Sequence, residues 1–185
     1  MVKLRLFAPV LPKGDDLVMI EVAVATEIQK EQIWHLFQEY AQELSFYDDA
    51  HRPKSRYHYP YFDLYWTEDG RIPFVLLYDH EMVGFCLLRD TNVSFQIAEF
   101  YITPLHRRRG FGKAVVEHIK EYCCQQDKHK ILTANIYVNN TPAIRFWQST
   151  GFRDTGRRIR IKHLRMIEAE MDLVADENRV CKSSF

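Results

Sequence analysis

Short apolar runs of strand length recur along the chain and are separated by turn residues. They are rich in β-branched and aromatic residues, which favour strands over buried helix segments. Only Asp-His-Glu-Met separates the runs at 72–78 and 83–89, so these two are expected to form a hairpin. Strands are predicted at residues 19–24, 72–78, 83–89, 94–102 and 130–138, with one or two closing strands within 159–173.

Two other segments carry apolar residues at steps of three and four, which is the period of an amphipathic helix. The first covers roughly residues 26–45, and the second runs from Gly112 to about Cys124. Between the first helix and the hairpin, residues 45–66 are aromatic and polar and have no clean period. We expect a loop there, with at most one short helix.

A third helix is predicted within residues 139–152, which carry the signals of both helix ends. Asn140 or Thr141 can cap its start, and Gly151 can end it. The resulting order of strands and helices predicts a mixed α/β fold. The length of 185 residues suits one domain.

We place that domain at residues 19–173. Met19 can serve as a start, so residues 1–18 are interpreted as an N-terminal extension. Residues 174–185 have little to bury and are interpreted as a C-terminal tail.

Composition and charge exclude several classes of protein. With 46% hydrophobic and 27% charged residues, the chain resembles ordinary globular proteins and not disordered ones. A formal net charge of zero argues against a dedicated nucleic-acid binder, and no apolar run approaches the ~18 residues of a membrane span. The four cysteines have neither CxxC nor zinc-site spacing, so we expect reduced thiols, no metal and a cytoplasmic location.

The most informative stretch is PLHRRRGFGK at residues 104–113, where a predicted strand gives way to a predicted helix. The first amides of a helix are unpaired and stabilise an anion. Glycines let the backbone approach a ligand closely, and basic side chains form charge-assisted bonds to phosphate oxygens. The stretch therefore predicts a pyrophosphate cradle. Its residues are Arg107, Arg108, Arg109, Gly110, Phe111, Gly112 and Lys113.

Two common phosphate-binding motifs do not fit this stretch. A P-loop requires glycine where Arg107 stands, and serine or threonine where Ala114 stands. A dinucleotide fingerprint requires glycine at the place of Val115. One or two of the arginines could also simply face water.

The stretch does resemble the acetyl-CoA loop of the GNAT superfamily of N-acetyltransferases. That family has Arg/Gln-x-x-Gly-x-Gly/Ala after a strand, and Ile102, Pro104, Arg107, Gly110 and Gly112 match it in order. The family commonly has glycine directly after the first arginine, whereas this chain has Arg108 there.

A second motif strengthens the resemblance, which spans about residues 19–173. The family often has Asn-x-x-Ala followed by two aromatic residues and then Gly-Phe. Here Asn140 and Ala143 precede Phe146, Trp147 and a Gly-Phe pair. The chain is also similar to a bacterial subgroup of predicted acetyltransferases, which shares YW before Glu, the RIPF segment and FW in this motif.

The resemblance implies the GNAT acyl-CoA N-acyltransferase fold. This α/β fold has a mixed, mostly antiparallel sheet with splayed central strands, here 94–102 and 130–138, flanked by helices. The backbone of Phe100, Tyr101 and Ile102 would pair with the pantetheine arm of acetyl-CoA, and residues 107–113 would hold its pyrophosphate. Asn140 would also touch the cofactor.

The resemblance further implies a carboxylate base near the end of strand 94–102, because an acceptor amine with a pKa near about 10 is protonated at neutral pH. Glu99 is the candidate, and a structural ion pair is the alternative. The family often has a tyrosine acid where Trp147 stands. Tyr101, Tyr137 or water could replace it, and Trp147 could be a core residue.

Acceptor specificity is expected in the 45–66 loop, because loops on a rigid scaffold carry such variation. Its aromatic and acidic residues suit a cationic amine, and we select Tyr47, Tyr65 and Trp66. Alternatively, these aromatics cover a sheet edge. Basic residues within 153–165 could favour an anionic acceptor or form a solvated face.

Taken together, these motifs predict a cytoplasmic N-acetyltransferase that uses acetyl-CoA. A small-molecule or peptide amine would attack directly in a ternary complex, and no nucleic acid or membrane partner is expected. Many members of the family dimerise, so a homodimer is one option. A regulatory module that binds acyl-CoA with little turnover is the alternative function, and nucleic-acid binding by the arginines is a third.

Overall fold

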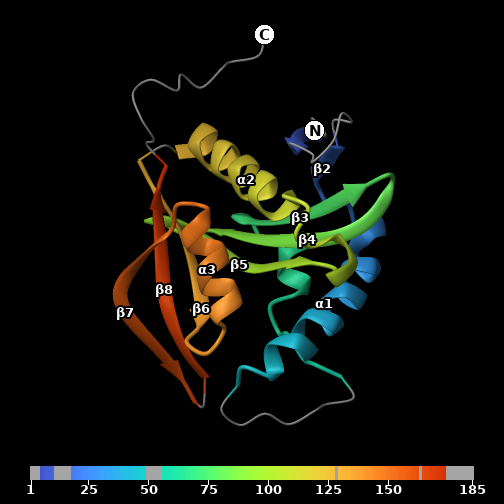
Figure 1. The fold of residues 1–185 in the computed structure, drawn as a ribbon. Helices are drawn as coiled ribbons and strands as arrows, with labels where there is room; N and C mark the ends of the chain where they lie inside the picture. The colour runs from blue at the N-terminus through green and yellow to red at the C-terminus, as the bar shows by residue number, and fades with distance from the viewer. Residues whose placement is uncertain (1–4, 11–17, 49–55, 128, 163, 174–185) are drawn as a thin grey trace.

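The computed structural model describes residues 5–10, 18–48, 56–127, 129–162 and 164–173 (Figure 1). Eight strands form one mixed sheet in the order β1-β2-β3-β4-β5-β6-β8-β7. The strands are β1 (Arg5–Val10), β2 (Val18–Val24), β3 (Arg71–Tyr78), β4 (Glu81–Asp90), β5 (Ser94–Ile102), β6 (Ile131–Tyr137), β7 (Arg153–Ile161) and β8 (Leu164–Asp172). The helices are α1 (Lys30–Ser45), α2 (Phe111–Asp127) and α3 (Thr141–Ser149), with short 3₁₀ turns at Glu27–Gln29, Asp63–Trp66 and Pro104–His106.

The sequence predicted most of these elements. The hairpin of β3 and β4, strand β5 and all three helices lie where the apolar patterns placed them. Asn140 caps α3 as expected, because its Oδ1 accepts a hydrogen bond from the Ala143 amide at 3.1 Å. Strand β7 begins at Arg153, earlier than predicted, because its residues are mostly exposed and show no apolar alternation.

Part of the predicted N-terminal extension belongs to the sheet. Strand β1 pairs antiparallel with β2, from Arg5 opposite Ala23 to Val10 opposite Val18. This pairing differs from our placement of residues 1–18 outside the fold. The predicted tail, residues 174–185, lies outside the described residues.

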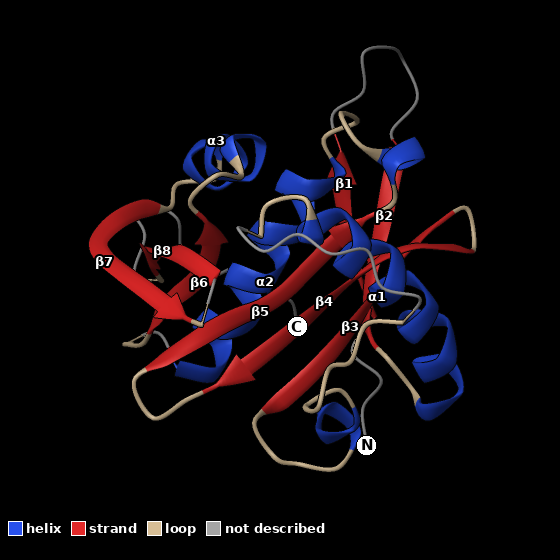
Figure 2. Cartoon of the chain, turned by 90° about the horizontal axis from the view of Figure 1, so that it is seen from below, coloured by secondary structure: helices blue, strands red, loops and turns tan. Residues whose placement is uncertain are grey.

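Two apolar clusters, one on each face of the sheet, form the core. One cluster packs the sheet against α2 and α3 and includes Phe111 and Trp147. The other packs it against α1 and includes Ile33 and Phe37. In both views of the fold, α1 and α3 lie on different sides of β5 (Figures 1 and 2). Among the described residues, no helix is both long and apolar enough to cross a membrane.

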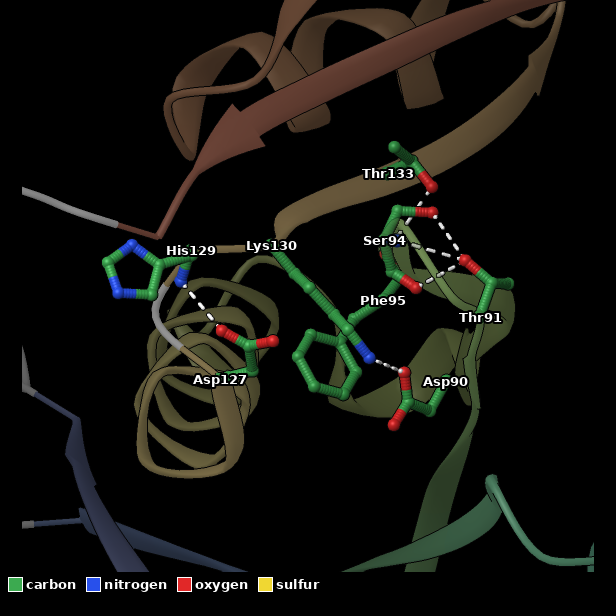
Figure 3. A network of polar contacts seen from close by, with 8 residues as sticks. All are labelled: Asp90, Thr91, Ser94, Phe95, Asp127, His129, Lys130 and Thr133. Carbon is green, nitrogen blue, oxygen red and sulfur yellow. Dashed lines mark hydrogen bonds and ion pairs between the residues drawn. The ribbon is translucent and has the colours of Figure 1, made fainter.

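The two central strands are joined at one end and separate at the other. Strands β5 and β6 pair in parallel only from Ser94 opposite Ile131 to Ile97 opposite Ala134. At the joined end, Lys130 Nζ lies 2.5 Å from Asp90 Oδ1 and 5.0 Å from the centre of the Phe95 ring (Figure 3). The predicted splay between the central strands is therefore confirmed, and it opens toward the carboxyl ends of both strands.

Candidate active site

A β-bulge in β5 decides which face carries Glu99. Leu87 of β4 lies opposite Glu99, and Leu88 lies opposite Ile97, so Ala98 is an extra residue in β5. Ile97 packs into the core under α2 and α3, whereas Ala98 packs into the core under α1. The bulge therefore turns Glu99 toward α1, just beyond the last residue of β5 that pairs with β6.

The Glu99 carboxyl is shielded from water and contacts two tyrosines. The residue is partly exposed as a whole, but its carboxyl is buried and lies close to the hydroxyls of Tyr40 on α1 and Tyr59, in contacts that fall short of well-formed hydrogen bonds. Burial raises the pKa of Glu99 to about 7, and the two hydroxyls oppose that rise. A carboxylate with a pKa near neutral pH is suited to accept a proton.

The charge of Glu99 also raises the pKa of two further tyrosines, Tyr137 and Tyr65. Burial, then Glu99 and Asp48, raise the pKa of Tyr137 on β6 to about 12. The Tyr65 hydroxyl is buried and lies beside that of Tyr59, in a geometry that falls short of a well-formed hydrogen bond. The open end of the splay is thus lined by one carboxyl and several phenols.

Tyr101, our other candidate catalytic residue, is turned toward α1. Its hydroxyl donates a hydrogen bond to Glu39 Oε2 at 3.2 Å, and its ring lies 5.3 Å from the Arg107 guanidinium. Burial, then Glu43 and Glu39, raise the pKa of this hydroxyl. A phenol that already donates to a carboxylate is poorly placed to act as an acid elsewhere.

The turn that precedes α2 is exposed and carries two left-handed residues. Arg108 has φ +63° and Gly110 has φ +85°. The positive φ at Arg108 explains why glycine suits this position better, since side chains with a Cβ rarely adopt it. Arg109 lies over the Tyr78 ring at 5.6 Å, and Lys113 is exposed at the start of α2.

Arg107 does not point away from the protein with its neighbours. Its Nε donates to the carbonyl of Ile102 at 2.7 Å, and its Nη2 donates to Glu43 Oε2 at 2.7 Å. The guanidinium predicted to hold phosphate is therefore engaged with the end of β5 and with α1.

Gly112 and Phe111 bring α2 close to the rest of the site. A Cβ at Gly112 would lie 2.8 Å from Cε2 of Phe146, so this close approach of α2 to α3 requires glycine unless the Phe146 ring shifts. Phe146 in turn stacks on Phe100 with ring centres 5.7 Å apart. The Phe111 side chain is buried in the core, which leaves its backbone amide, and not its ring, for any ligand.

Trp147 is a core residue in this structure. Its ring lies 5.6 Å from that of Phe100, 5.1 Å from that of Phe146 and 4.8 Å from that of Phe152. It is the buried residue of α3 and faces the core. These contacts support the interpretation of Trp147 as packing.

The three predicted acceptor residues are not brought together. Tyr65 lies near Glu99. The Trp66 indole donates to the Thr26 carbonyl at 3.3 Å, which ties it to the segment before α1. Tyr47 is partly buried just after α1, and residues 49–55 of the predicted acceptor loop lie outside the described residues.

An open pocket of about 510 Å³ lies between the start of α1 and residues 56–63. Tyr59 lines it and also reaches Glu99. No pattern in the sequence predicts a site role for Tyr40 or Tyr59. Tyr40 fits an apolar position of the first helix, and Tyr59 is one of many aromatic residues in the 45–66 loop. Only their shared approach to a buried carboxyl identifies them.

The basic residues after α3 are largely paired within the sheet. Arg153 contacts Glu170 and Asp172 at 3.0 and 2.8 Å, and Arg158 contacts Asp154 at 2.8 Å. These ion pairs favour the solvated-face interpretation over a surface for an anionic acceptor.

Comparison with known proteins places this geometry among acetyltransferases. A model of the acetyltransferase (GNAT) family matches residues 30–152. Peptidyl-lysine N-acetyltransferase YiaC of Escherichia coli is 30% identical over 87 residues, which are 47% of this chain and 47% of that protein. Peptidyl-lysine N-acetyltransferase YjaB of Salmonella typhimurium is 35% identical over 77 residues, 42% of this chain and 46% of that protein. The chain thus matches about half the length of these relatives.

Solved structures share the fold at low sequence identity. The ribosomal-protein-S18-alanine N-acetyltransferase of Escherichia coli superimposes with a TM-score of 0.65 at 16% identity, over 88% of this chain and 99% of that one. The spermidine N-acetyltransferase of Vibrio cholerae, solved with CoA and spermine, gives 0.66 at 13% identity, over 84% and 98% of the two chains.

Proposed function

Because the chain belongs to the acetyltransferase (GNAT) family, we propose that it transfers an acetyl group from acetyl-CoA to an amine acceptor. The observation that carries this proposal is the Glu99 carboxyl, which lies between two tyrosine hydroxyls at the open end of the β5–β6 splay. An amine acceptor has a pKa of about 10 and is therefore protonated at neutral pH. Glu99 takes the proton and leaves a neutral amine that can attack.

The backbone of β5 beyond the bulge suits the pantetheine arm. Phe100, Tyr101 and Ile102 pair with β4 on one side, while β6 has separated from them on the other. Apart from the Ile102 carbonyl, which accepts from Arg107, peptide groups on that side are available to an added strand-like ligand. The thioester of acetyl-CoA, when bound there, supplies the acetyl group.

The turn before α2 suits a pyrophosphate. Arg108, Arg109 and Lys113 provide exposed positive charge, and the amides from Gly110 to Gly112 begin a helix. We revise the role of Arg107: it holds the turn against Glu43 and Ile102 and is not a phosphate ligand. Asn140, which was also expected at the cofactor, serves first as the cap of α3.

The leaving thiolate does not require a tyrosine acid. Tyr101 donates to Glu39, and Tyr137 has a pKa of about 12. A thiol has a pKa near 8.5, so transfer of a proton from Tyr137 to the thiolate is unfavourable. We propose that water protonates the thiolate, which removes the need for a tyrosine at the position of Trp147.

Direct attack by the amine is favoured over a covalent enzyme intermediate. Cys86 and Cys123 are buried, and burial raises the pKa of both thiols, so neither is a ready nucleophile. The amine and the cofactor would therefore meet in one ternary complex.

The names of the curated relatives support one class of acceptor. Both curated relatives are named as peptidyl-lysine N-acetyltransferases, so we propose a lysine side chain first, and a small polyamine second. The alternative is a module that binds acyl-CoA without turnover. Transfer from labelled acetyl-CoA to lysine peptides and polyamines tests the proposal. If the protein binds CoA but transfers acetyl to no amine, the alternative of an acyl-CoA-binding module is favoured.

A further inference from the structure

Four phenol groups lie near Glu99 and come from different parts of the chain. Tyr40 comes from α1, Tyr59 from the segment before the second 3₁₀ turn, Tyr65 from that turn, and Tyr137 from β6. Within the described part of the chain, no lysine, arginine or histidine shifts the pKa of Glu99. The carboxyl thus depends on hydroxyl groups, and not on an ion pair, to stabilise its charge.

We propose that Tyr40 and Tyr59 are positioning residues that hold Glu99 ionised and aimed into the splay. The proposal rests on the proposed role of Glu99 as the base. Each hydroxyl can donate one hydrogen bond to the carboxylate, and bonds to a charged acceptor are about twice as strong as neutral ones. Two donors from different elements also fix the direction of the carboxyl plane.

The two tyrosines are held in different ways. The Tyr40 ring lies 5.9 Å from that of Phe85 and 5.7 Å from that of Tyr101, within the core under α1. The Tyr59 ring stacks on Phe37 at 5.0 Å and lines the open pocket of about 510 Å³. Tyr40 is therefore the fixed donor, and Tyr59 is the donor nearest to solvent.

The buried hydroxyl of Tyr65 adds an independent observation. It has no well-formed hydrogen bond and lies beside the Tyr59 hydroxyl, although buried hydroxyls are normally paired. Tyr59 can donate to Glu99 and, at the same time, accept from Tyr65. The Arg71 guanidinium lies 5.4 Å from the centre of the Tyr65 ring. A Tyr65 donor would polarise the Tyr59 hydroxyl toward the carboxylate.

The donors offset part of the cost of burial. Burial alone disfavours the ionised carboxyl, and both hydroxyls act in the opposite direction. Without them, Glu99 would be largely protonated at neutral pH and unable to accept a proton from an ammonium group.

Tyr59→Phe and Tyr40→Phe test the proposal, with Tyr61→Phe as the matched control. Tyr61 belongs to the same segment and is exposed, and its ring lies 5.9 Å from that of Tyr59. The Glu99 carboxyl is followed by ¹³C NMR during a pH titration of the cofactor-free protein, and its signal is assigned by its loss in Glu99→Gln. The pH dependence of kcat/KM is measured in parallel.

We expect each phenol removal to move the Glu99 titration upward by about one pH unit, because each hydroxyl stabilises the ionised form of the carboxyl. The acidic limb of kcat/KM moves by the same amount, so activity at pH 6.5 falls roughly tenfold and recovers at higher pH. Tyr61→Phe leaves both unchanged.

An unchanged Glu99 titration in Tyr59→Phe and Tyr40→Phe overturns the proposal. If Tyr40→Phe fails to fold, the titration of Tyr59→Phe alone tests the proposal. Tyr59 borders an open pocket, so loss of its hydroxyl should not prevent folding. The NMR readout needs no acetyl transfer. A shifted titration in a protein that acetylates nothing would therefore support the positioning role and reject the proposed function.

Discussion

The Arg107 guanidinium donates to the Glu43 carboxylate at 2.7 Å and joins the turn before α2 to helix α1. The same side chain donates to the carbonyl of Ile102, the last residue of β5. One arginine thus fixes the exposed turn to α1, which carries Tyr40, and to β5, which carries Glu99. Its position in the motif is that of a phosphate ligand, whereas its hydrogen bonds connect the turn to α1 and β5.

This relationship gives opposite expectations for Glu43→Gln. If Arg107 braces the turn, the loss of Glu43 loosens it, and CoA binds about two- to fivefold more weakly, the effect of a half-exposed ion pair. If Arg107 instead served phosphate, removing a nearby negative charge would tighten CoA binding. Calorimetry with CoA, and with pantetheine as the phosphate-free control, separates the two.

Arg108→Gly is expected to stabilise the folded protein by up to about 1 kcal/mol. The left-handed conformation of Arg108 is strained for a residue with a Cβ, and glycine adopts it freely. Arg109→Gly is the matched control, because Arg109 is not among the positive-φ residues that the structure describes. It should lose roughly 0.5–1 kcal/mol instead. Urea denaturation measures both, and equal changes would contradict the strain at Arg108.

Gly84→Ala and Gly112→Ala should differ sharply. A Cβ at Gly84 would lie 2.2 Å from the carbonyl oxygen of Tyr101, and backbone there cannot move without breaking the β4–β5 pairing. We expect little or no folded protein. A Cβ at Gly112 meets only the Phe146 ring, which can shift at a cost of about 1–3 kcal/mol. Circular dichroism and denaturation of both variants check this order.

The buried carboxyl makes stability depend on pH in a defined direction. Folding raises the pKa of Glu99 from 4.5 to about 7, so its contribution to stability is fully present below pH 4.5 and is lost as the pH rises through 7. Glutamine does not titrate, so Glu99→Gln does not lose stability in this pH range. Relative to wild type, the variant should gain roughly 3 kcal/mol between pH 4 and pH 8. A difference that does not vary with pH would show that Glu99 is not buried.

The sequence predicted the parts of this site that depend on local patterns. Apolar periodicity located the central strands, and glycines between a strand end and a helix start located the turn. The orientation of Glu99 could not be predicted, because it depends on a bulge at Ala98 that arises from the register with β4. The partner of Arg107 is Glu43, which lies on a helix far away in sequence.

The tyrosines illustrate a second limit. Phenols are amphipathic, so Tyr40 fits an apolar helix face and also supplies a hydroxyl to a buried carboxyl. Trp66 was selected as an aromatic residue of the predicted acceptor loop, yet its indole donates to the Thr26 carbonyl before α1. In each case the decisive contact is tertiary and leaves no local signal.

The most direct test of the account is the single-turnover rate of acetyl transfer to a lysine peptide by wild type and Glu99→Gln, each saturated with acetyl-CoA. CoA affinity, measured by calorimetry, controls for damage to the cofactor site. We predict that CoA affinity is retained and that the rate at pH 7 falls by about 10²–10⁴, the contribution typical of a general base. Equal rates for the two proteins would contradict the assignment of Glu99 and, with it, the mechanism proposed for this site.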